Sequence, residues 1–180
     1  MQNRKRQKLP KDIPNLSKVN YVSVNFNRQS LQQELLRAGF NPNKPTIFTL
    51  EGVSQYITKP ALNSTLDQVS CLTLNSRTVF YMSYVDPALK TKPARCFGKG
   101  YPRVQSISKT IMNLAEKVGE PWISFYSSME LQAILTQYGF NMVENKVLQD
   151  LNAKYFTPAG RALPEKELFN LEHSVVAVKT

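Results

Sequence analysis

The sequence contains one histidine and two cysteines in 180 residues, and this scarcity excludes several kinds of site. Cys71 and Cys96 lie far apart with no second pair of ligands nearby, so they fit neither a zinc site of the usual spacing nor a disulfide framework. A hydrolytic triad would need His173 beside a nucleophile, and no nucleophile-elbow glycines surround any serine or cysteine. We therefore predict no metal site, and we expect His173 to be a structural residue.

Glycine-rich motifs and long apolar runs are also missing. The seven glycines never form G-x-G-x-x-G or G-x-x-x-x-G-K, and the one close pair, Gly98 and Gly100, does not follow a predicted strand. No stretch approaches the roughly 20 apolar residues that a membrane span needs. The N-terminus has no apolar segment of the signal-peptide kind. These absences predict a cytoplasmic protein without a membrane partner.

The composition is that of an ordinary folded domain. Apolar residues make up 42% of the chain and charged residues 20%, which excludes disordered, collagenous and coiled-coil proteins. A chain of this length buries a sizeable core without metals or disulfides. We predict a single domain over 1–180, with a basic helical arm at 1–20 and the remaining fold at 21–180.

Positive charge is concentrated in two segments of a chain whose net charge is +10. One is the basic arm. The other, here called the basic cluster, contains no acid and consists of Lys90, Lys92, Arg95, Lys99, Arg103 and Lys109. Such segments attract phosphates without reading sequence, so a basic nucleic-acid-binding protein is one alternative. Two solvated segments are the plainer interpretation, and we favour it.

Hydrophobic periodicity predicts strands that alternate with helices. Strands are expected at 21–26, 46–50, 78–84, 140–147 and 171–178, and helices after Ser30 and at 59–72, 104–117 and 127–138. Residues 86–103 have no periodicity and are expected to form a long loop. This order predicts an α/β fold with a mainly parallel sheet, in which 46–50 is covered on both faces. The last two strands have no helix between them and should pair antiparallel at an edge.

Polar residues follow two of the predicted strands. Glu51 comes directly after the apolar strand 46–50, where a carboxylate is costly unless it meets a partner or a ligand. Asn25 stands at the end of the first strand, where its amide can exchange hydrogen bonds with a flat heterocycle. Ligands bind at this carboxyl edge of open α/β sheets. The alternative is that Glu51 caps a helical turn and Asn25 makes a local turn, and the residues alone leave both open.

Several segments together resemble the leucine carboxyl methyltransferase family, especially its bacterial branch. The most specific element is the run Glu-Gly-Val-Ser-Gln-Tyr-Ile at 51–57. The similarity continues in order over nearly the whole chain, at 22–26, 37–40, 45–46, 83–85, 119–122, 139–140, 155–156 and 171–177. It implies a class I methyltransferase fold, Rossmann-like, with an antiparallel edge strand.

The resemblance also implies a cofactor, a reaction and three site residues. The cofactor is S-adenosylmethionine, and the reaction is transfer of its methyl group to a carboxylate or hydroxyl oxygen of a small molecule or chain terminus. Asn25, Phe26 and Glu51 match the positions that border the cofactor in the family. Asn25 replaces the usual aspartate, which keeps an acceptor oxygen and loses the charge. Substrate and catalytic residues differ across the family, so none is assigned.

One family feature has no counterpart in the sequence. Family members begin with a strand, a glycine-rich turn and an acidic residue that holds the ribose, whereas 2–8 here resemble the helix after the second strand. We therefore expect the chain to correspond to the C-terminal portion, with the N-terminal strands missing. By itself it should bind S-adenosylmethionine poorly or not at all, and it should be oligomeric or unstable. A catalytically inactive or partner-dependent fragment, pairing with a separate N-terminal half, is the alternative.

Overall fold

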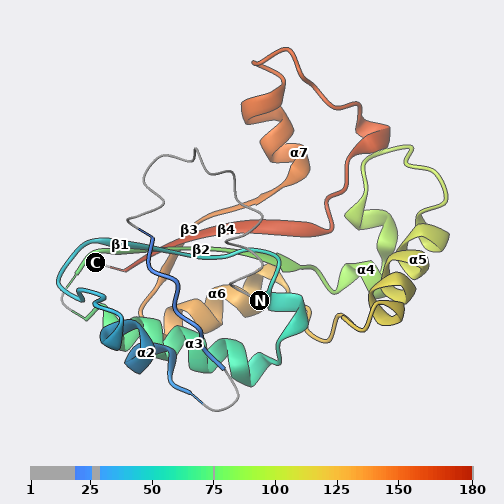
Figure 1. Cartoon of the computed structure of the whole chain (residues 1–180). Coiled ribbons are helices and arrows are strands. Elements are labelled where there is room, and N and C mark those ends of the chain that lie inside the picture. The colour runs from blue at the N-terminus through green and yellow to red at the C-terminus, as the bar shows by residue number, and fades with distance from the viewer. Residues whose placement is uncertain (1–18, 26–28, 75, 180) are drawn as a thin grey trace.

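The computed structural model describes residues 19–25, 29–74 and 76–179 (Figure 1). The strands are β1 (Thr46–Leu50), β2 (Thr78–Val85), β3 (Asn141–Val147) and β4 (Glu172–Lys179). The α-helices are α2 (Leu31–Arg37), α3 (Lys59–Leu72), α4 (Ala88–Thr91), α5 (Val104–Lys117), α6 (Ser128–Gln137) and α7 (Leu148–Leu151). Short helical turns of other types are η2 (Ser54–Tyr56), η3 (Pro93–Cys96), η4 (Asn152–Phe156) and η5 (Glu165–Glu167).

The described strands form one mixed sheet in the order β1-β2-β4-β3. β1 and β2 run parallel, with Leu50 opposite Met82, so β2 continues beyond the end of β1. β4 pairs antiparallel with both β2 and β3, and β3 lies at the edge as expected. The α/β class is confirmed. The expectation of a mainly parallel sheet is not, because β4 is inserted between β2 and β3 and makes two of the three described pairings antiparallel.

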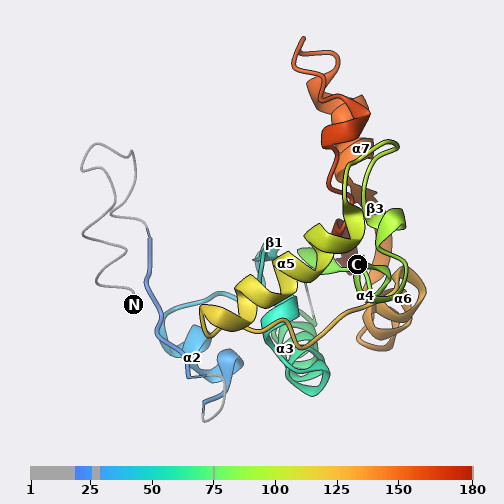
Figure 2. The same cartoon turned by 90° about the vertical axis from the view of Figure 1, so that its right-hand side faces the viewer.

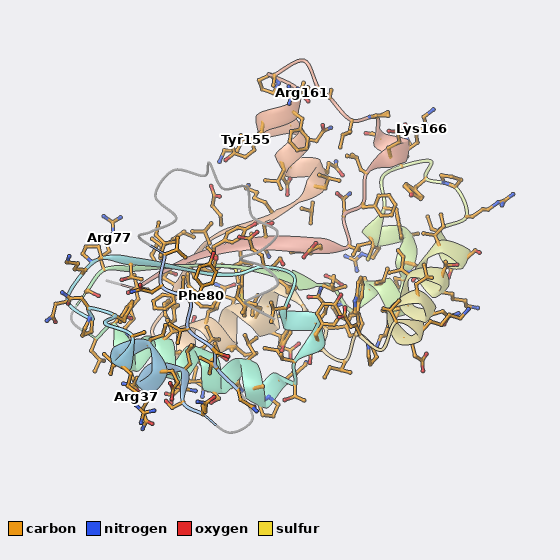
Figure 3. The ribbon with its side chains drawn as sticks, in the orientation of Figure 1. Arg37, Arg77, Phe80, Tyr155, Arg161 and Lys166 are labelled. Atoms are coloured by element: carbon orange, nitrogen blue, oxygen red, sulfur yellow. The ribbon has the colours of Figure 1, made fainter. Side chains whose placement is uncertain are left out.

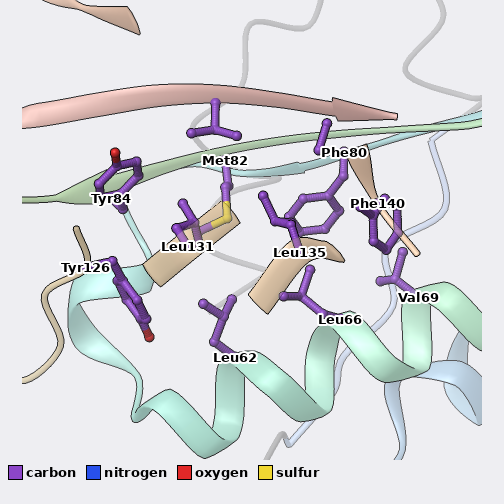
Figure 4. Close-up of a cluster of buried hydrophobic side chains, with 12 residues drawn as sticks. Leu62, Leu66, Val69, Phe80, Met82, Tyr84, Tyr126, Leu131, Leu135 and Phe140 are labelled. Carbon is purple, nitrogen blue, oxygen red and sulfur yellow. The ribbon is translucent and has the colours of Figure 1, made fainter. Parts of the chain in front are cut away.

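Helices α3 and α6 cover one face of the sheet (Figures 1 and 2). Leu62, Leu66 and Val69 recur on one side of α3 and point towards the sheet, as Figure 4 shows. Thr58 caps this helix, its hydroxyl accepting a hydrogen bond from the Ala61 amide. The core cluster consists of Leu62, Leu66, Val69, Phe80, Met82, Tyr84, Tyr126, Leu131, Leu135, Phe140, Val175 and Ala177. Burial of this apolar face holds the helices to the sheet.

The opposite face of the sheet is less covered. Side chains alternate along β1, so that Phe48 and Leu50 pack against the core while Ile47 is 70% exposed. The expectation that 46–50 is covered on both faces is therefore wrong. In Figure 3, Phe80 points from β2 towards the helices, and Tyr155 and Arg161 lie on the segment that projects from the other side.

A second cluster of buried side chains lies beyond the carboxyl end of β2. It joins Val85, Leu89, Cys96, Phe97 and Phe125, with α5 packed against it through Val104, Ile107 and Ile111. Two short helical elements, α4 and η3, lie within 86–103, where the sequence predicts only a loop. These elements have four residues each, too few for a helical period to show in a sequence.

The N-terminal expectations are met only in part. Ser30 caps α2 as predicted, its hydroxyl accepting from the Gln33 amide, and Gly39 follows the helix with φ of +87°. Residues 21–25 belong to no strand, so the strand predicted at 21–26 is wrong there. The described sheet consists of β1, β2, β4 and β3 and does not include this segment. Phe26 and residues 1–18 of the arm lie outside the described residues.

Candidate functional site

The run 51–57 forms a tight turn at the carboxyl end of β1. Gly52 has φ of +63°, a conformation that favours glycine, and its amide donates a hydrogen bond to Ser83 Oγ at 2.8 Å. The Ser54 hydroxyl donates to the Ser83 carbonyl at 2.7 Å. Ser83 lies on β2, so two hydrogen bonds attach the turn to the neighbouring strand.

Gln55 occupies the centre of this turn and is 5% exposed. Its carbonyl accepts hydrogen bonds from the amides of Ile123 (2.8 Å) and Ser124 (3.2 Å), which hold the segment before α6 against the turn. Its side-chain Oε1 is buried and has no hydrogen-bond partner among the described residues. A buried acceptor of this kind is costly unless a donor reaches it.

Two hollows meet at Tyr56 and Ile123, and together they form what we call the Tyr56 crevice. One, of about 580 Å³, is lined by Val24, Asn25, Tyr56, Ile57, Thr58, Ala61 and Ile123. The other, of about 470 Å³, is lined by Gly52, Tyr56, Gly119, Glu120, Pro121 and Ile123. Tyr56 is 38% exposed and Ile123 51%, so the crevice presents apolar surface to solvent.

Of the predicted site residues, the structure places Asn25 in the lining of the crevice and Glu51 beside it in the chain, next to Gly52. Asn25 lines the crevice, and its backbone exchanges hydrogen bonds with Gln29, whose side chain accepts from the Asn25 amide. Glu51 is exposed and lies between Leu50, which contacts the core, and Gly52, which lines the crevice. Phe26 lies outside the described residues, so its predicted role stays a prediction.

A separate hollow of about 560 Å³ lies at the carboxyl end of β2, and we call it the Asp86 pocket. Its lining is charged and polar as well as apolar, and consists of Asp86, Pro87, Ala88, Thr91, Lys92, Arg95, Cys96, Ser127, Val147, Gln149, Asn170 and His173. Lys92 and Arg95 come from the basic cluster. Part of that cluster therefore lines a pocket.

His173 is held firmly at one wall of this pocket. Its ring stacks on the Tyr84 ring at 4.8 Å, opposite it in the β2–β4 register. Its Nδ1 lies 3.2 Å from Asn145 Oδ1, and its Nε2 lies 3.8 Å from Asp86 Oδ2. Burial lowers the pKa of the imidazole below its usual value, although the carboxylates of Asp86 and Asp150 act in the opposite direction.

Sequence reasoning missed this pairing. It treated His173 as structural and gave no role to Asp86, because the two residues are far apart in the chain and become neighbours only through the antiparallel pairing of β2 and β4. One signal in the sequence could have indicated Asp86 as a site residue. It directly follows the strand β2, just as Glu51 directly follows β1.

The residues that the structure describes contain neither a cluster of metal ligands nor a membrane-spanning helix. Within them, no group of three or more histidine, cysteine, aspartate or glutamate side chains is arranged to hold a metal ion. None of the helices described there has the length and apolar character to cross a bilayer.

Comparisons with solved structures identify similar folds. A duf574 family protein from Streptomyces avermitilis is 12% identical, with a TM-score of 0.55 over 89% of this chain and 55% of that one. Magnesium protoporphyrin IX methyltransferase from Synechocystis, with SAH bound, is 10% identical, with a TM-score of 0.41 over 74% of this chain and 44% of that one. Mycolic acid cyclopropane synthase, complexed with SAH and CTAB, is 12% identical, with a TM-score of 0.47 over 78% and 56%. The chain thus spans about half the length of these proteins.

Sequence comparison gives one family. No curated protein matches the chain. The family model described as leucine carboxyl methyltransferase matches residues 1–70, which include the turn at 51–57 and the Asn25 side of the crevice. The resemblance seen in the sequence is thereby confirmed over this part of the chain: residues 1–70 are similar to the leucine carboxyl methyltransferases.

Proposed function

We propose that this chain functions in S-adenosylmethionine-dependent methyl transfer to an oxygen atom, a carboxylate or a hydroxyl, of a small molecule or chain terminus. One observation carries the proposal: the family match over residues 1–70 contains the 51–57 turn, and that turn borders a crevice at the carboxyl end of a parallel strand. Open α/β sheets bind ligands at this edge. The solved proteins with SAH bound have similar folds, which is consistent with the same cofactor.

The residues around the Tyr56 crevice fit an adenosyl group. The exposed Tyr56 ring offers a face for a flat base or a cation. The Asn25 amide, on the same crevice, can both accept and donate hydrogen bonds. We therefore propose Asn25, Phe26 and Glu51 as cofactor-binding residues.

The chain's own contribution to the reaction is alignment and electrostatics. S-adenosylmethionine supplies an electrophilic methyl group on a positively charged sulfur. Methyl transfer is an in-line displacement, so the protein must orient the donor and the acceptor and exclude water. The Glu51 carboxylate, next to the Gly52 wall of the crevice, favours binding of a positively charged group.

Titration with S-adenosylhomocysteine, followed by ¹H–¹⁵N NMR, tests the cofactor proposal. We expect weak but saturable binding, because the chain has no glycine-rich phosphate-type turn to add backbone contacts. Shifts should concentrate at Asn25, Gln55 and Tyr56. Replacing Glu51→Gln should weaken binding roughly tenfold, since it removes a charge-assisted hydrogen bond.

Glu116→Gln is the matched control, because Glu116 is an equally exposed glutamate on α5 that does not line the crevice. Its affinity should equal that of the wild type. The cofactor proposal is wrong if no saturable shift occurs, or if the two glutamate variants bind alike.

A partner-dependent form of this function is favoured by the position of β1. β1 lies at the edge of the described sheet, and Ile47 on it is 70% exposed. Exposed apolar edges of this kind pair readily with another strand. We propose that activity depends on a neighbouring chain segment that pairs with β1. A higher affinity for S-adenosylhomocysteine when the chain self-associates would support this proposal.

A further inference from the structure

The Asn145 side chain contacts Tyr84, Ser128 and His173. Asn145 Nδ2 donates to the Tyr84 hydroxyl at 2.9 Å and to Ser128 Oγ at 2.7 Å. Its Oδ1 therefore faces His173 Nδ1, 3.2 Å away, and can only accept. With the Asn145 amide in this orientation, a neutral imidazole that is hydrogen-bonded to it carries its proton on Nδ1 and has its lone pair on Nε2.

Nε2 faces a second acceptor across the Asp86 pocket. Asp86 Oδ2 lies 3.8 Å from Nε2, while Oδ1 of the same carboxylate accepts from the Ala88 amide at 2.6 Å. Two acceptors that face each other at this distance repel unless a donor lies between them or the imidazole is protonated. Burial opposes protonation and lowers the pKa of His173, outweighing the opposite effect of the Asp86 and Asp150 carboxylates, and the His173 side chain retains 18% exposure. The pair is thus arranged to receive a hydrogen-bond donor.

The rest of the lining selects for negative charge on the same ligand. Lys92 and Arg95 line the pocket and form no ion pair with any described residue. Asn170 and Gln149 also line the pocket and are hydrogen-bonded to each other. The backbone amide of Gln149 donates to Asn170 Oδ1 at 2.9 Å, and the backbone amide of Asn170 donates to the Cys96 carbonyl at 2.7 Å. A volume of about 560 Å³ lies within the range of small-molecule sites.

We propose that the Asp86 pocket binds the methyl acceptor, a small organic anion that carries a hydroxyl group, with the hydroxyl donating to His173 Nε2 and the anionic group facing Lys92 and Arg95. The identity of the ligand as the acceptor rests on the proposed function; the pocket's chemistry does not. Both the pocket and the Tyr56 crevice lie at the carboxyl ends of the parallel pair β1 and β2. The proposed function allows methyl transfer to either a carboxylate or a hydroxyl oxygen. This geometry favours the hydroxyl, because a carboxylate has no proton to donate to Nε2.

The first test is an NMR measurement of the tautomer of His173, and it needs no assignment because the sequence contains a single histidine. In protein labelled with ¹⁵N at histidine, one imidazole gives the whole signal. Near pH 8 we expect the Nδ1–H tautomer, with Nε2 unprotonated. Observation of the Nε2–H tautomer would overturn the proposal, since Nε2 would then donate to Asp86 and accept nothing. This measurement needs no variant.

The second test uses three probes without the cofactor: 3-hydroxybenzoate, benzoate and phenol. We expect 3-hydroxybenzoate to shift the His173 signal and to bind roughly tenfold more tightly than benzoate, which lacks the hydroxyl, or phenol, which lacks the charge. The double variant Lys92→Gln/Arg95→Gln should abolish the advantage over phenol. Lys99→Gln/Lys109→Gln, from the same basic cluster but outside the pocket, should retain it.

The outcomes separate this proposal from the proposed function. The pocket assignment is overturned if no probe shifts His173, or if both double variants lose 3-hydroxybenzoate equally. Titratable groups that face the imidazole are Asp86, Asp150 and Tyr84, with Lys92, Arg95 and Cys96 on the pocket wall, so the comparison is made at a single pH. Binding of 3-hydroxybenzoate by a chain that shows no saturable binding of S-adenosylhomocysteine would support the pocket and count against the proposed function alone.

Discussion

Gly98 lies where the loop after η3 contacts η5, and we predict that alanine at this position destabilises the fold. A Cβ added at Gly98 would lie 1.8 Å from the Glu165 carbonyl oxygen, 2.8 Å from its carbon and 3.1 Å from Leu168 Cβ. The Gly98 amide also donates to the Leu168 carbonyl at 2.9 Å. The nearest atoms belong to the backbone, so no side-chain rotation relieves the overlap.

The magnitude follows from the displacement that Gly98→Ala requires. An ordinary contact for a Cβ is longer than 3 Å, so the two segments must separate by more than 1 Å. Overpacking of this kind costs about 1–3 kcal/mol, and loss of the hydrogen bond to Leu168 adds about 1 kcal/mol. We expect a loss of about 2–4 kcal/mol in the free energy of unfolding, which lowers Tm by about 5–15 °C.

Gly100→Ala is the matched control for thermal denaturation followed by circular dichroism. Gly100 has φ of +79° and nothing within 4 Å of an added Cβ, so alanine there meets only backbone strain, about 1 kcal/mol. Gly98→Ala should therefore melt below Gly100→Ala. Equal melting temperatures, or the reverse order, would refute the assigned contact between the loop and residues 165–168.

Three further predictions concern single side chains. Because burial lowers the pKa of His173, the unfolded chain takes up a proton below about pH 6.5 more readily than the folded protein does. The free energy of unfolding should therefore fall from pH 7 to pH 5. In chemical denaturation, His173→Gln should reduce this dependence on pH, and an unchanged dependence would contradict the prediction. Cys71 is exposed, whereas burial raises the pKa of Cys96 to about 11. A thiol reagent at pH 8 should therefore label Cys71 quickly and Cys96 only when the protein unfolds. Fast labelling of both cysteines would be inconsistent with the structure. Ile47→Lys places a charge on the exposed edge strand and should reduce self-association in sedimentation velocity, while an equal charge at exposed Leu114 on α5 should not.

Elements with a strong local signal were predictable from the sequence. Ser30 before α2 and the apolar spacing of Leu62, Leu66 and Val69 in α3 depend on residues within a few positions of one another. The run 51–57 is recognisable in the sequence as a contiguous motif of the family resemblance, although its turn conformation is not predicted. Local hydrogen bonds and a single buried face determine these elements.

Features that depend on distant pairing were not predictable. The segment 21–25 has the alternation of a strand but is not part of the described sheet, and pairing with distant strands is not visible in a local pattern. The exposure of Ile47 likewise depends on which elements cover the sheet. Asp86 and His173 meet through the register that places Tyr84 opposite His173, and a shift of one residue would separate them.

Ser83 limits how the turn at 51–57, beside the Tyr56 crevice, can move. Its hydroxyl and its carbonyl each hold one residue of the turn, Gly52 and Ser54, so the turn opens only if both bonds break or β2 moves with it. The turn therefore shares the rigidity of the central strand although it lies at the surface. Slow exchange of the Gly52 amide hydrogen, at the rate of the β2 amides, would be the signature of this shared motion.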